Sequence, residues 1–378
     1  MPLDLSERSV DPQRVNQDAL HALLPEVYNR IPRVSLGAWP TPIESLNLSG
    51  TQAPHFVKRE DLSASDYGGN KVRCLETIFG ASKESQLEQV WATGAYGSNQ
   101  ALAMATHASR ADLKVGALLF PQPPSLTAKE NLRALATHEC DIRLAPSLLH
   151  YPFALAALWR RTRSRPERII PPGAAVPLGA LGHVAAALEV AIDVECRVLL
   201  RPEHVVLPVG STCTAAGLVL GFALARHLGL GGFDAGPTIH AVRISPWPVT
   251  ARFRILGLAL RTASLLHTLG GPDLRDSIKA SAHLVCAGGF MGGGYGRATK
   301  AGLEAQKVFD EQGAPALDTT YSAKAAAHLL RDLEVQGPVL FWSTKSSAPL
   351  PLPTKDELLS LPRRGQVWLV KPGFTGAE

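Results

Sequence analysis

The sequence predicts an α/β fold of open, twisted parallel sheets with helices on both faces. Three observations support this class: β-rich runs alternate with Ala- and Leu-rich helical segments, polar turns follow several of these runs, and the composition is that of an ordinary folded chain. The 378 residues are 46% hydrophobic and 19% charged, and this length allows two or three domains. Strands are expected at 89–93, 114–120, 204–209, 239–245 and 339–344.

The first fifty residues contain several prolines, and we expect them to form an arm that wraps a domain. Acidic residues occur early in "MPLDLSERSVDPQR" and no apolar stretch follows, so this pattern does not predict a secretory signal. Further along the chain, residues 160–177, "RRTRSRPERIIPPGAAVP", are rich in Arg and Pro. They are the expected internal linker.

The segment "GGNKVRCLETIFG" at 68–80 predicts a helix that begins at Lys71. Asn70 is a residue type that caps helices, and the apolar residues that follow recur on one helical face, at Val72, Leu75, Ile78 and Phe79. Lys71 would then lie at the positive end of the helix dipole, where an ammonium is disfavoured. Such a place favours the neutral, nucleophilic amine, which can form a Schiff base with a carbonyl.

Three polar turns come directly after predicted strands. They are "TGAYGSNQ" (93–100), "GSTCTAAG" (210–217) and "STKSS" (343–347). The carboxyl ends of parallel strands meet at one edge of a sheet, where open α/β folds bind their ligands. We therefore expect the three turns to converge on a single pocket.

The turn at 210–217 has the composition of an anion cradle. A glycine and a run of hydroxyl and thiol residues precede an apolar helix, so backbone N–H groups would point at a ligand such as phosphate. The turn lacks both the G-K-[ST] of a P-loop and the G-x-G-x-x-G of a dinucleotide site. A plain strand-to-helix turn rich in small residues fits the same pattern.

A phosphate cradle and an amine poised for imine formation together point to pyridoxal phosphate, whose aldehyde the amine of Lys71 would bind. Taken alone, Lys71 could equally be a surface lysine after a Gly-Gly turn. The run "GGFMGGGYG" (288–296) lacks the strand-then-helix context of a nucleotide site and predicts a flexible loop that carries Tyr295.

Other kinds of site find little support. No G-x-S-x-G elbow of a serine hydrolase occurs, and none of the 12 histidines falls in an H-E-x-x-H spacing. The cysteines are odd in number and without a C-x-x-C spacing, so we expect neither a disulfide framework nor a metal site; they are Cys74, Cys140, Cys196, Cys213 and Cys286. A reducing, cytoplasmic location is the corresponding expectation.

The charge pattern predicts no nucleic-acid or membrane partner. The net charge of +5 is spread along the chain, and the basic run at 159–168 lacks the interleaved aromatic residues of a single-strand binder. Residues 205–225 carry no charge and are long enough to span a membrane. Pro208 and Gly210 interrupt that stretch, however, and we expect a strand, a polar turn and a buried helix there.

Five ordered segments resemble the family of pyridoxal-phosphate enzymes that includes D-cysteine desulfhydrase and 1-aminocyclopropane-1-carboxylate deaminase, of the fold-type II, tryptophan synthase β-like group. The similarity is collinear from about residue 36 to 345. The segment with the lysine is "VKREDLSASDYGGNKVRCLE", and "PGAAVPLGALGHVAAALEV" resembles the G-x-L-G-Y stretch of the family. The others are "GSTCTAAGL", "GGYGRATKAGLEA" and "LDTTYSAKAAAHL", which resemble the phosphate loop and the segments with two active-site tyrosines.

The resemblance implies a role for each matching residue toward the cofactor. Lys71 would bind pyridoxal phosphate covalently and move the α-proton of the substrate, with Asn70 beside it. Asn99 would donate a hydrogen bond to the phenolic oxygen of the cofactor, and Thr344 would lie next to the pyridine nitrogen. The phosphate would be held by Gly210, Ser211, Thr212, Cys213 and Thr214.

The substrate is expected to be a small amino acid that contacts Ser98, Asn99, Gln100, Tyr295 and Tyr321. Ser98 matches a residue that engages the carboxylate, and the two tyrosines match those that face the substrate. A hydroxyl at Thr344 cannot keep the pyridine nitrogen protonated as a carboxylate would, which favours eliminations.

Two positions separate the branches of the family, and both match the desulfhydrases here. The ring-opening deaminases carry Glu directly after the second tyrosine and Leu at the position of Thr344, whereas this chain has Ser322 and Thr344. The expected reaction is α-proton abstraction and β-elimination to a 2-oxo acid and ammonia. A deaminase of 1-aminocyclopropane-1-carboxylate, a racemase, a β-replacement enzyme and a degenerate cofactor-binding protein remain the alternatives.

Four departures from the family pattern predict a reshaped pocket. Q-S-N-H becomes G-S-N-Q at 97–100, and G-S-G-G-T becomes G-S-T-C-T at 210–214. H-T-G-G becomes S-T-K-S at 343–346, and Y-S-G-K becomes Y-S-A-K at 321–324. Glycine permits a positive φ or the close approach of a ligand, so its loss changes the shape of the site.

The resemblance also implies two α/β domains with the cofactor in the cleft between them. Residues 82–192 would form the small domain, and residues 1–81 with 193–378 would form the large, cofactor-binding domain together with the N-terminal arm. Such enzymes are usually homodimers, which is the expected assembly.

Overall fold

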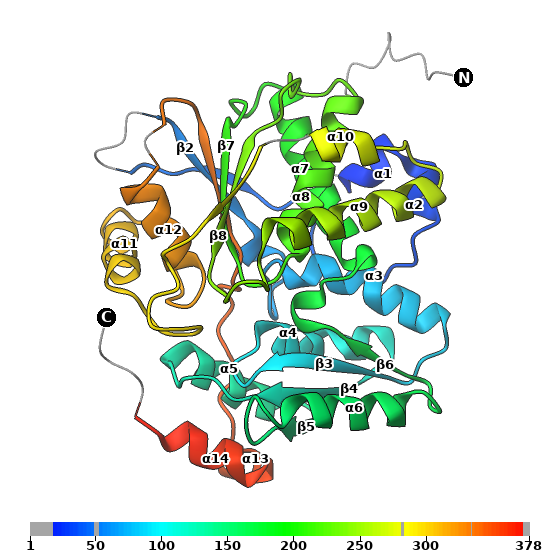
Figure 1. The fold of residues 1–378 in the computed structure, drawn as a ribbon, viewed down its shortest axis with the longest axis vertical. Coiled ribbons are helices and arrows are strands. Elements are labelled where there is room, and N and C mark those ends of the chain that lie inside the picture. Colours follow the sequence, from blue (N-terminus) through cyan, green and yellow to red (C-terminus); the bar gives the residue numbers. More distant parts are fainter. Residues whose placement is uncertain (1–17, 49–52, 281–282, 334, 373–378) are drawn as a thin grey trace.

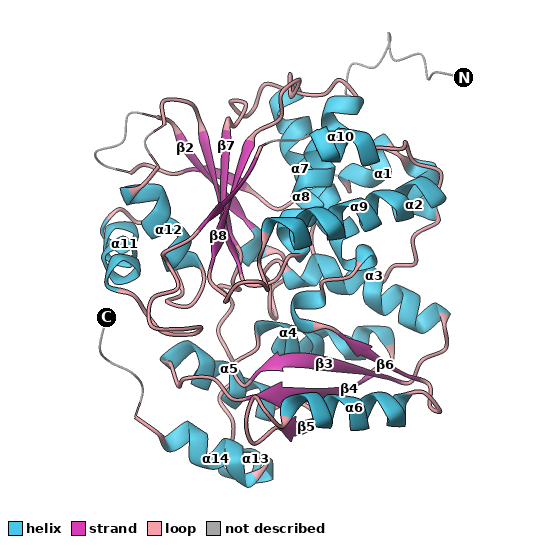
Figure 2. Cartoon of the chain, in the orientation of Figure 1, coloured by secondary structure: helices cyan, strands magenta, loops and turns pink. Residues whose placement is uncertain are grey.

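The computed structural model describes residues 18–48, 53–280, 283–333 and 335–372, which form two α/β domains (Figures 1 and 2). The large domain contains a six-stranded sheet and the small domain a four-stranded one. Helices cover both faces of the large sheet, as the alternating sequence pattern predicts. The predicted N-terminal arm falls partly outside the described residues; from Asp18 onward it is folded against the core.

The six-stranded sheet has the order β1-β2-β10-β7-β8-β9, and only β1 is antiparallel to its neighbour among these described strands. The strand predictions at 204–209, 239–245 and 339–344 are confirmed to within two residues. The bounds are β1 Ile43–Ser45, β2 His55–Arg59, β7 His204–Val209, β8 Thr238–Arg243, β9 Leu284–Ala287 and β10 Val339–Ser343.

Alternate residues of the central strands enter two different cores, because successive side chains of a strand point to opposite faces. Val205 and Leu207 of β7 pack in the core that contains α7 Pro177–Glu195 and α8 Cys213–His227. Val206 lies in a second core with residues of α11 Lys300–Glu311 and α12 Ser322–Arg331. Both faces of the strand are therefore buried, which explains its continuous apolar run.

The four-stranded sheet is parallel and has the order β5-β4-β3-β6. Its strands are β3 Gln89–Ala95, β4 Lys114–Phe120, β5 Cys140–Leu144 and β6 Glu167–Ile170. The predictions at 89–93 and 114–120 are confirmed. The predicted linker at 160–177 is wrong, because residues 167–170 pair with β3 as an edge strand and the preceding residues end a helix.

The remaining helices complete the layers around the two sheets (Figure 1). In the small domain they are α4 Asn99–His107, α5 Leu126–Ala136 and α6 Tyr151–Thr162. In the large domain they are α1 Ala19–Leu23, α2 Pro25–Asn29, α3 Lys71–Glu84, α9 Arg252–Thr268 and α10 Arg275–Ala280. Single 3₁₀ turns lie at Glu60–Leu62, Ala108–Ala111 and Pro172–Ala174.

The domain boundaries differ from the expected ones at two places. Most of α7 falls within 82–192, the range expected for the small domain. The helix packs against α3 and α8, however, and so belongs to the large domain. The C-terminal helices α13 Lys355–Ser360 and α14 Arg363–Val370 pack on the small domain instead of the large one. There the Trp368 indole donates to the Gln122 carbonyl over 2.9 Å and meets the Tyr96 ring edge-on.

α7 is long and apolar enough to cross a membrane by composition alone, but 78% of its most apolar window is buried inside the protein. The uncharged stretch at 205–225 divides into β7, a polar turn and α8, as expected. Both apolar segments therefore form part of the hydrophobic core of the large domain.

Four buried charged side chains hold α3 against α7 and β2. Arg73 binds Glu60 over 2.6 Å and Glu189 over 2.7 Å, and Lys58 also binds Glu189 over 2.7 Å. The four side chains are at most 2% exposed, and their two positive and two negative charges balance. Buried charges are tolerated only when they are paired and hydrogen-bonded in this way.

We predict that Glu189→Ala lowers the free energy of unfolding by about 3–5 kcal/mol, because Lys58 and Arg73 lose their shared buried partner. The control is Glu311→Ala, which removes an exposed ion pair with Lys307 and should cost less than about 1 kcal/mol. Chemical denaturation of both variants measures the difference. Equal, small losses would show that the buried network does not determine stability.

Candidate active site

Lys71 is the first residue of α3, as predicted, and its ammonium lies at the wall of a cavity between the domains. The ammonium nitrogen is 3.4 Å from the carbonyl oxygen of Gly173, a long hydrogen bond. Asn70 precedes the helix but does not cap it through its side chain, which corrects the expected N-cap. Its Nδ2 donates to the Thr214 hydroxyl over 2.9 Å and so links the lysine segment to the turn at 210–217.

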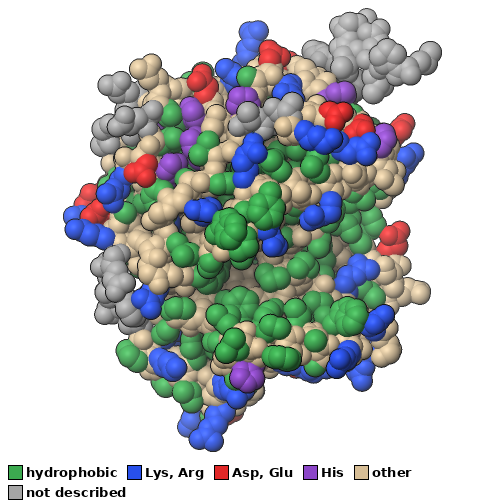
Figure 3. All heavy atoms as spheres, viewed as in Figure 1, with side chains coloured by type: hydrophobic (Ala, Val, Ile, Leu, Met, Phe, Trp, Pro, Cys, Tyr) green, Lys and Arg blue, Asp and Glu red, His purple; other side chains and the backbone are tan. Residues whose placement is uncertain are grey.

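The cavity has a volume of about 600 Å³, within the range of cofactor and ligand pockets. Nearly all of the predicted site residues line it: Asn70, Lys71, Ser98, Asn99, Gln100, Gly210, Ser211, Thr214, Tyr295, Tyr321 and Thr344. Apolar residues form much of the remaining wall, among them Phe120, Pro121, Pro123, Leu148, Pro208, Pro246 and Val249. Figure 3 shows apolar side chains gathered around a hollow between the two parts of the molecule.

The turn between β7 and α8 has the geometry that the predicted anion cradle requires. α8 begins at Cys213, and Thr212 before it makes no side-chain capping bond, so the first N–H groups of the helix are left for a ligand. The Ser245 hydroxyl donates to the Gly210 carbonyl over 2.9 Å and fixes the turn. A Cβ at Gly210 would lie 2.9 Å from the Tyr321 ring, so the site requires glycine there.

Two predicted phosphate-binding residues do not line the cavity with their side chains. Thr212 is 6% exposed, and Cys213 is fully buried with its thiol donating to the Ala174 carbonyl over 3.1 Å. Both residues can therefore reach a phosphate only through backbone N–H groups. The replacement of a small residue by Cys213 is accommodated because its side chain points into the protein core.

The side-chain amide of Asn99 is oriented by two donors. Asn131 Nδ2 donates to Asn99 Oδ1 over 2.5 Å, and the Tyr67 hydroxyl donates to the same oxygen over 3.2 Å. With its oxygen engaged, Asn99 presents its N–H₂ group to the cavity that it lines. That is the group required to donate to a phenolic oxygen. Asn131 also donates to the Gly97 carbonyl over 2.9 Å, which holds the turn beneath the site.

Ser98 and Gln100 flank Asn99 but differ in how they are used. Ser98 caps α4, its oxygen accepting from the Ala101 N–H over 3.2 Å, and its hydroxyl hydrogen remains free to bind a carboxylate. Gln100 donates to the Pro171 carbonyl and accepts from the Ala174 N–H, over 3.1 Å each. Its amide shapes the cavity wall, and direct contact with a substrate stays a prediction.

Tyr295 and Tyr321 come from distant segments and meet in the cavity, where their hydroxyl groups form a short hydrogen bond. Burial raises the pKa of both phenols, so they stay protonated at neutral pH. Asp318 accepts from the N–H of Tyr321 over 2.8 Å and fixes its backbone. Lys324 donates to the Met291 carbonyl over 2.9 Å and holds the glycine-rich loop that carries Tyr295.

Some groups that support the site were missed by sequence reasoning. Asn131 lies within an ordinary helical pattern, and only its polar character on a buried helix face sets it apart. Asp318 stands just before "TTYS", and an Asp followed by backbone N–H groups is a local turn signal that could have identified it. Lys324 is fully buried, and burial lowers its pKa to about 8.

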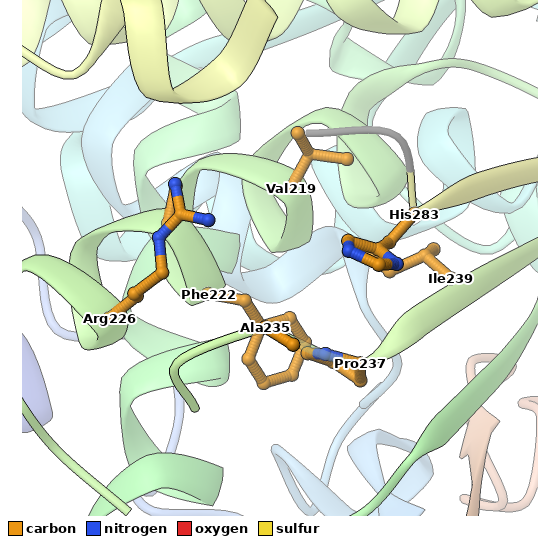
Figure 4. A pocket seen from close by; sticks show the side chains of 9 residues that line it. Val219, Phe222, Arg226, Ala235, Pro237, Ile239 and His283 are labelled. Atoms are coloured by element: carbon orange, nitrogen blue, oxygen red, sulfur yellow. The ribbon is translucent and has the colours of Figure 1, made fainter. Parts of the chain in front are cut away.

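A small hollow lies between α8 and the start of β8 and is not a candidate active site (Figure 4). Its volume is about 20 Å³, enough for a single water molecule. It is lined mainly by apolar residues such as Val219, Phe222 and Ile239, with Arg226 and His283 at its sides. The cavity at Lys71, which brings the predicted site residues together, is the candidate active site.

Comparison with known proteins identifies the class that this fold and site define. Residues 34–344 match the family model of the pyridoxal-phosphate dependent enzymes, to which the chain belongs. It is 32% identical over 332 residues to nocardicin C-9' epimerase from Nocardia uniformis subsp. tsuyamanensis, covering 84% of this chain and 93% of that protein. It is 29% identical over 335 residues to D-cysteine desulfhydrase from Salmonella choleraesuis (strain SC-B67), covering 85% and 96%.

Solved structures confirm the fold-type II architecture. An ACC deaminase homologue superimposes with a TM-score of 0.70 at 24% identity and covers 91% of this chain and 98% of that one. A fungal L-serine ammonia-lyase from Rhizomucor miehei superimposes with a TM-score of 0.54 at 15% identity, covering 81% and 93%. The chain is thus a divergent member of the family of D-cysteine desulfhydrases and ACC deaminases, whose cofactor is pyridoxal phosphate.

The residues of the cavity fit this cofactor. Lys71 supplies the amine, the turn at 210–214 supplies helix N–H groups for the phosphate, and Asn99 supplies an oriented amide donor. Thr344 lines the same cavity, and its carbonyl accepts from the Asn70 N–H over 3.0 Å. That Thr344 is the uncharged partner of the pyridine nitrogen stays a prediction.

We predict that Lys71→Ala removes the visible absorption that the covalent link between lysine and pyridoxal phosphate gives. The control is Lys83→Ala, on the last turn of the same helix and paired with exposed Asp112, which should keep the absorption. Spectra recorded after loading and gel filtration measure the effect. A colourless wild-type protein, or a coloured Lys71→Ala variant, would contradict the assignment.

We predict that Asn131→Ala weakens cofactor binding about tenfold, because Asn99 loses the donor that orients its amide. Titration of cofactor-free protein with pyridoxal phosphate gives the dissociation constant. Asn29→Ala on exposed α2 is the matched control and should leave the constant unchanged. Equal constants for Asn131→Ala and wild type would show that Asn99 does not depend on this support.

Proposed function

We propose that the protein is a pyridoxal-phosphate dependent lyase that takes the α-proton from a small amino acid and eliminates a substituent from Cβ. The released enamine is hydrolysed by water to a 2-oxo acid and ammonia. The observation that supports this most strongly is the shared cavity of Lys71, Tyr295 and Tyr321 beside the anion cradle. It offers an amine to accept a proton and a protonated phenol pair to donate one.

The cofactor, when bound, withdraws electrons from the amino acid and so acidifies its Cα–H bond. The residues of the chain supply the proton transfers. Lys71 Nζ, on the first residue of α3, accepts the proton from Cα. General base catalysis by a positioned group of this kind contributes about 10²–10⁴-fold to the rate.

The tyrosine pair is suited to protonating a leaving group. Both phenols stay protonated because burial raises their pKa, so they act as acids and not as bases at neutral pH. The hydrogen bond between the hydroxyl groups lets one phenol donate to the substituent while the other donates to the first. The developing charge on a departing group such as sulfide would thereby be neutralised.

The carboxylate of the substrate would be held at the start of α4. Ser98 caps this helix and lines the cavity, so its hydroxyl and the first N–H groups of the helix face the same ligand. With the carboxylate fixed on the small domain, Cα lies between this helix end and Lys71 of the large domain. Binding in this way orients the amino acid for proton removal.

Epimerisation is a second candidate, favoured by the 32% identity to nocardicin C-9' epimerase. The same residues would suffice, with Lys71 removing the α-proton and a phenol returning one to Cα instead of protonating a leaving group. The predominantly apolar wall of the cavity also suits an amino acid with a larger side chain. The two reactions differ in whether the bond at Cβ breaks.

We predict that the holoenzyme converts at least one amino acid with a leaving group at Cβ, such as D-cysteine, to a 2-oxo acid and ammonia. The assay is a panel of D- and L-amino acids and 1-aminocyclopropane-1-carboxylate in deuterated water, with 2-oxo acid, sulfide, chirality and deuterium at Cα measured. Inversion with deuterium uptake but without any 2-oxo acid would overturn the lyase in favour of the epimerase. Tyr321→Phe should lower kcat about 10²-fold or more in either case.

A further inference from the structure

Three side chains that bind soft metals meet behind the anion cradle, outside the cavity of the proposed reaction. Cys74 comes from α3, His183 from α7, and Cys213 is the first residue of α8. All three are 0% exposed, and their ligand atoms lie within 4.8 Å of one another. Among the described residues, this is the one group of at least three His, Cys, Asp or Glu that could hold a metal ion.

Two of the three distances between the ligand atoms are close to the edges of a tetrahedral zinc site. Cys74 Sγ is 3.7 Å from Cys213 Sγ and 3.3 Å from His183 Nε2. Zinc bonds of about 2.3 Å to sulfur and 2.0 Å to nitrogen place two sulfurs about 3.8 Å apart and a sulfur and a nitrogen about 3.6 Å apart. These two distances are within a few tenths of an ångström of the zinc values, and the third pair, Cys213 Sγ and His183 Nε2, lies within 4.8 Å.

The same distances do not suit a disulfide. The sulfurs of a disulfide are about 2.0 Å apart, so Cys74 and Cys213 would have to approach by well over 1 Å within a packed core. Thiols that respond to oxidants are usually exposed, whereas these are fully buried. The distance between the Cys74 and Cys213 sulfurs therefore suits two ligands of one metal ion better than a disulfide.

Charge and ligand chemistry favour zinc at this position. Two thiolates and one divalent cation make a neutral group, which is the least costly arrangement in a fully buried site. Cys and His are the ligands of structural zinc sites. The Thr214 hydroxyl, which lines the cofactor cavity, lies 3.3 Å from His183 Nε2. His183 and Cys213 stand where the family motifs G-x-L-G-Y and G-S-G-G-T have Tyr and Gly.

We propose that the protein binds one zinc ion through Cys74, His183 and Cys213, and that this ion ties α3 and α8, which contribute to the cofactor site, to α7. Cys74 is three residues after Lys71 on α3, and Cys213 is within the turn that forms the anion cradle. A metal ion here fixes the start of α3 relative to the start of α8. It would act as a structural support beneath the cofactor and not in the reaction.

Metal analysis of the holoenzyme tests this proposal. The protein is expressed in zinc-supplemented medium, so that the ion can enter as the chain folds, and excess metal is removed by gel filtration. We expect about one zinc ion per chain by mass spectrometry, and zinc-edge X-ray absorption with sulfur at about 2.3 Å and nitrogen at about 2.0 Å. Less than about one tenth of an ion per chain would overturn the proposal.

Variants locate the ion. Cys74→Ser should lower the zinc content at least about tenfold, as should His183→Asn, whereas Cys286→Ser on β9 should retain the wild-type content. Loss of zinc from Cys286→Ser equal to that from Cys74→Ser, or linked peptides containing Cys74 and Cys213 in the unreduced protein, would contradict the site. The wild-type stoichiometry decides the question even if a variant fails to fold.

Discussion

The geometry of the active site depends on a buried ion network that lies one turn away from it. Arg73 is two residues after Lys71, and its guanidinium binds Glu60 and Glu189. Each of these three side chains is at most 2% exposed. These bonds fix the rotation of α3 about its axis, since a turned helix would leave a charge unpaired in the core. Lys71 is consequently directed into the cavity by residues that never touch the cofactor.

Close packing of α3, α7 and α8 extends this constraint to the anion cradle. A Cβ at Gly182 would lie 2.3 Å from the Arg73 carbonyl oxygen, and a Cβ at Gly217 would lie 2.4 Å from Cβ of His183. Glycine therefore permits the three helices to approach each other more closely than other residues would. The lysine, the cradle and the buried thiols are parts of one closely packed layer of helices, which also contains the departure from the family pattern at 210–214.

The sequence predicted the buried, regular strands and helices well. It predicted less well the strands at the edges of the sheets and the contacts between residues far apart in the chain. The central strands β7, β8 and β10 have apolar runs that could be recognised, whereas β6 carries Glu167 and Arg168 because edge strands use charges. That charge made it resemble a linker. The site residues followed from motifs, but Asn131 and the cluster of Cys74 with His183 required the contacts between distant helices.

The division of the site between the domains constrains its chemistry. The large domain holds Lys71, the turn at 210–214 and the tyrosine pair, whereas the small domain holds Ser98 and Asn99 at the start of α4. Tyr321 and Lys71 therefore belong to one domain, whereas in the proposed reaction the carboxylate of the substrate is held by the other. Under that proposal, the position of the small domain would decide whether a phenol faces Cβ, to assist elimination, or Cα, to return a proton. The C-terminal helix α14, anchored on the small domain through Trp368, is a second connection that holds this position.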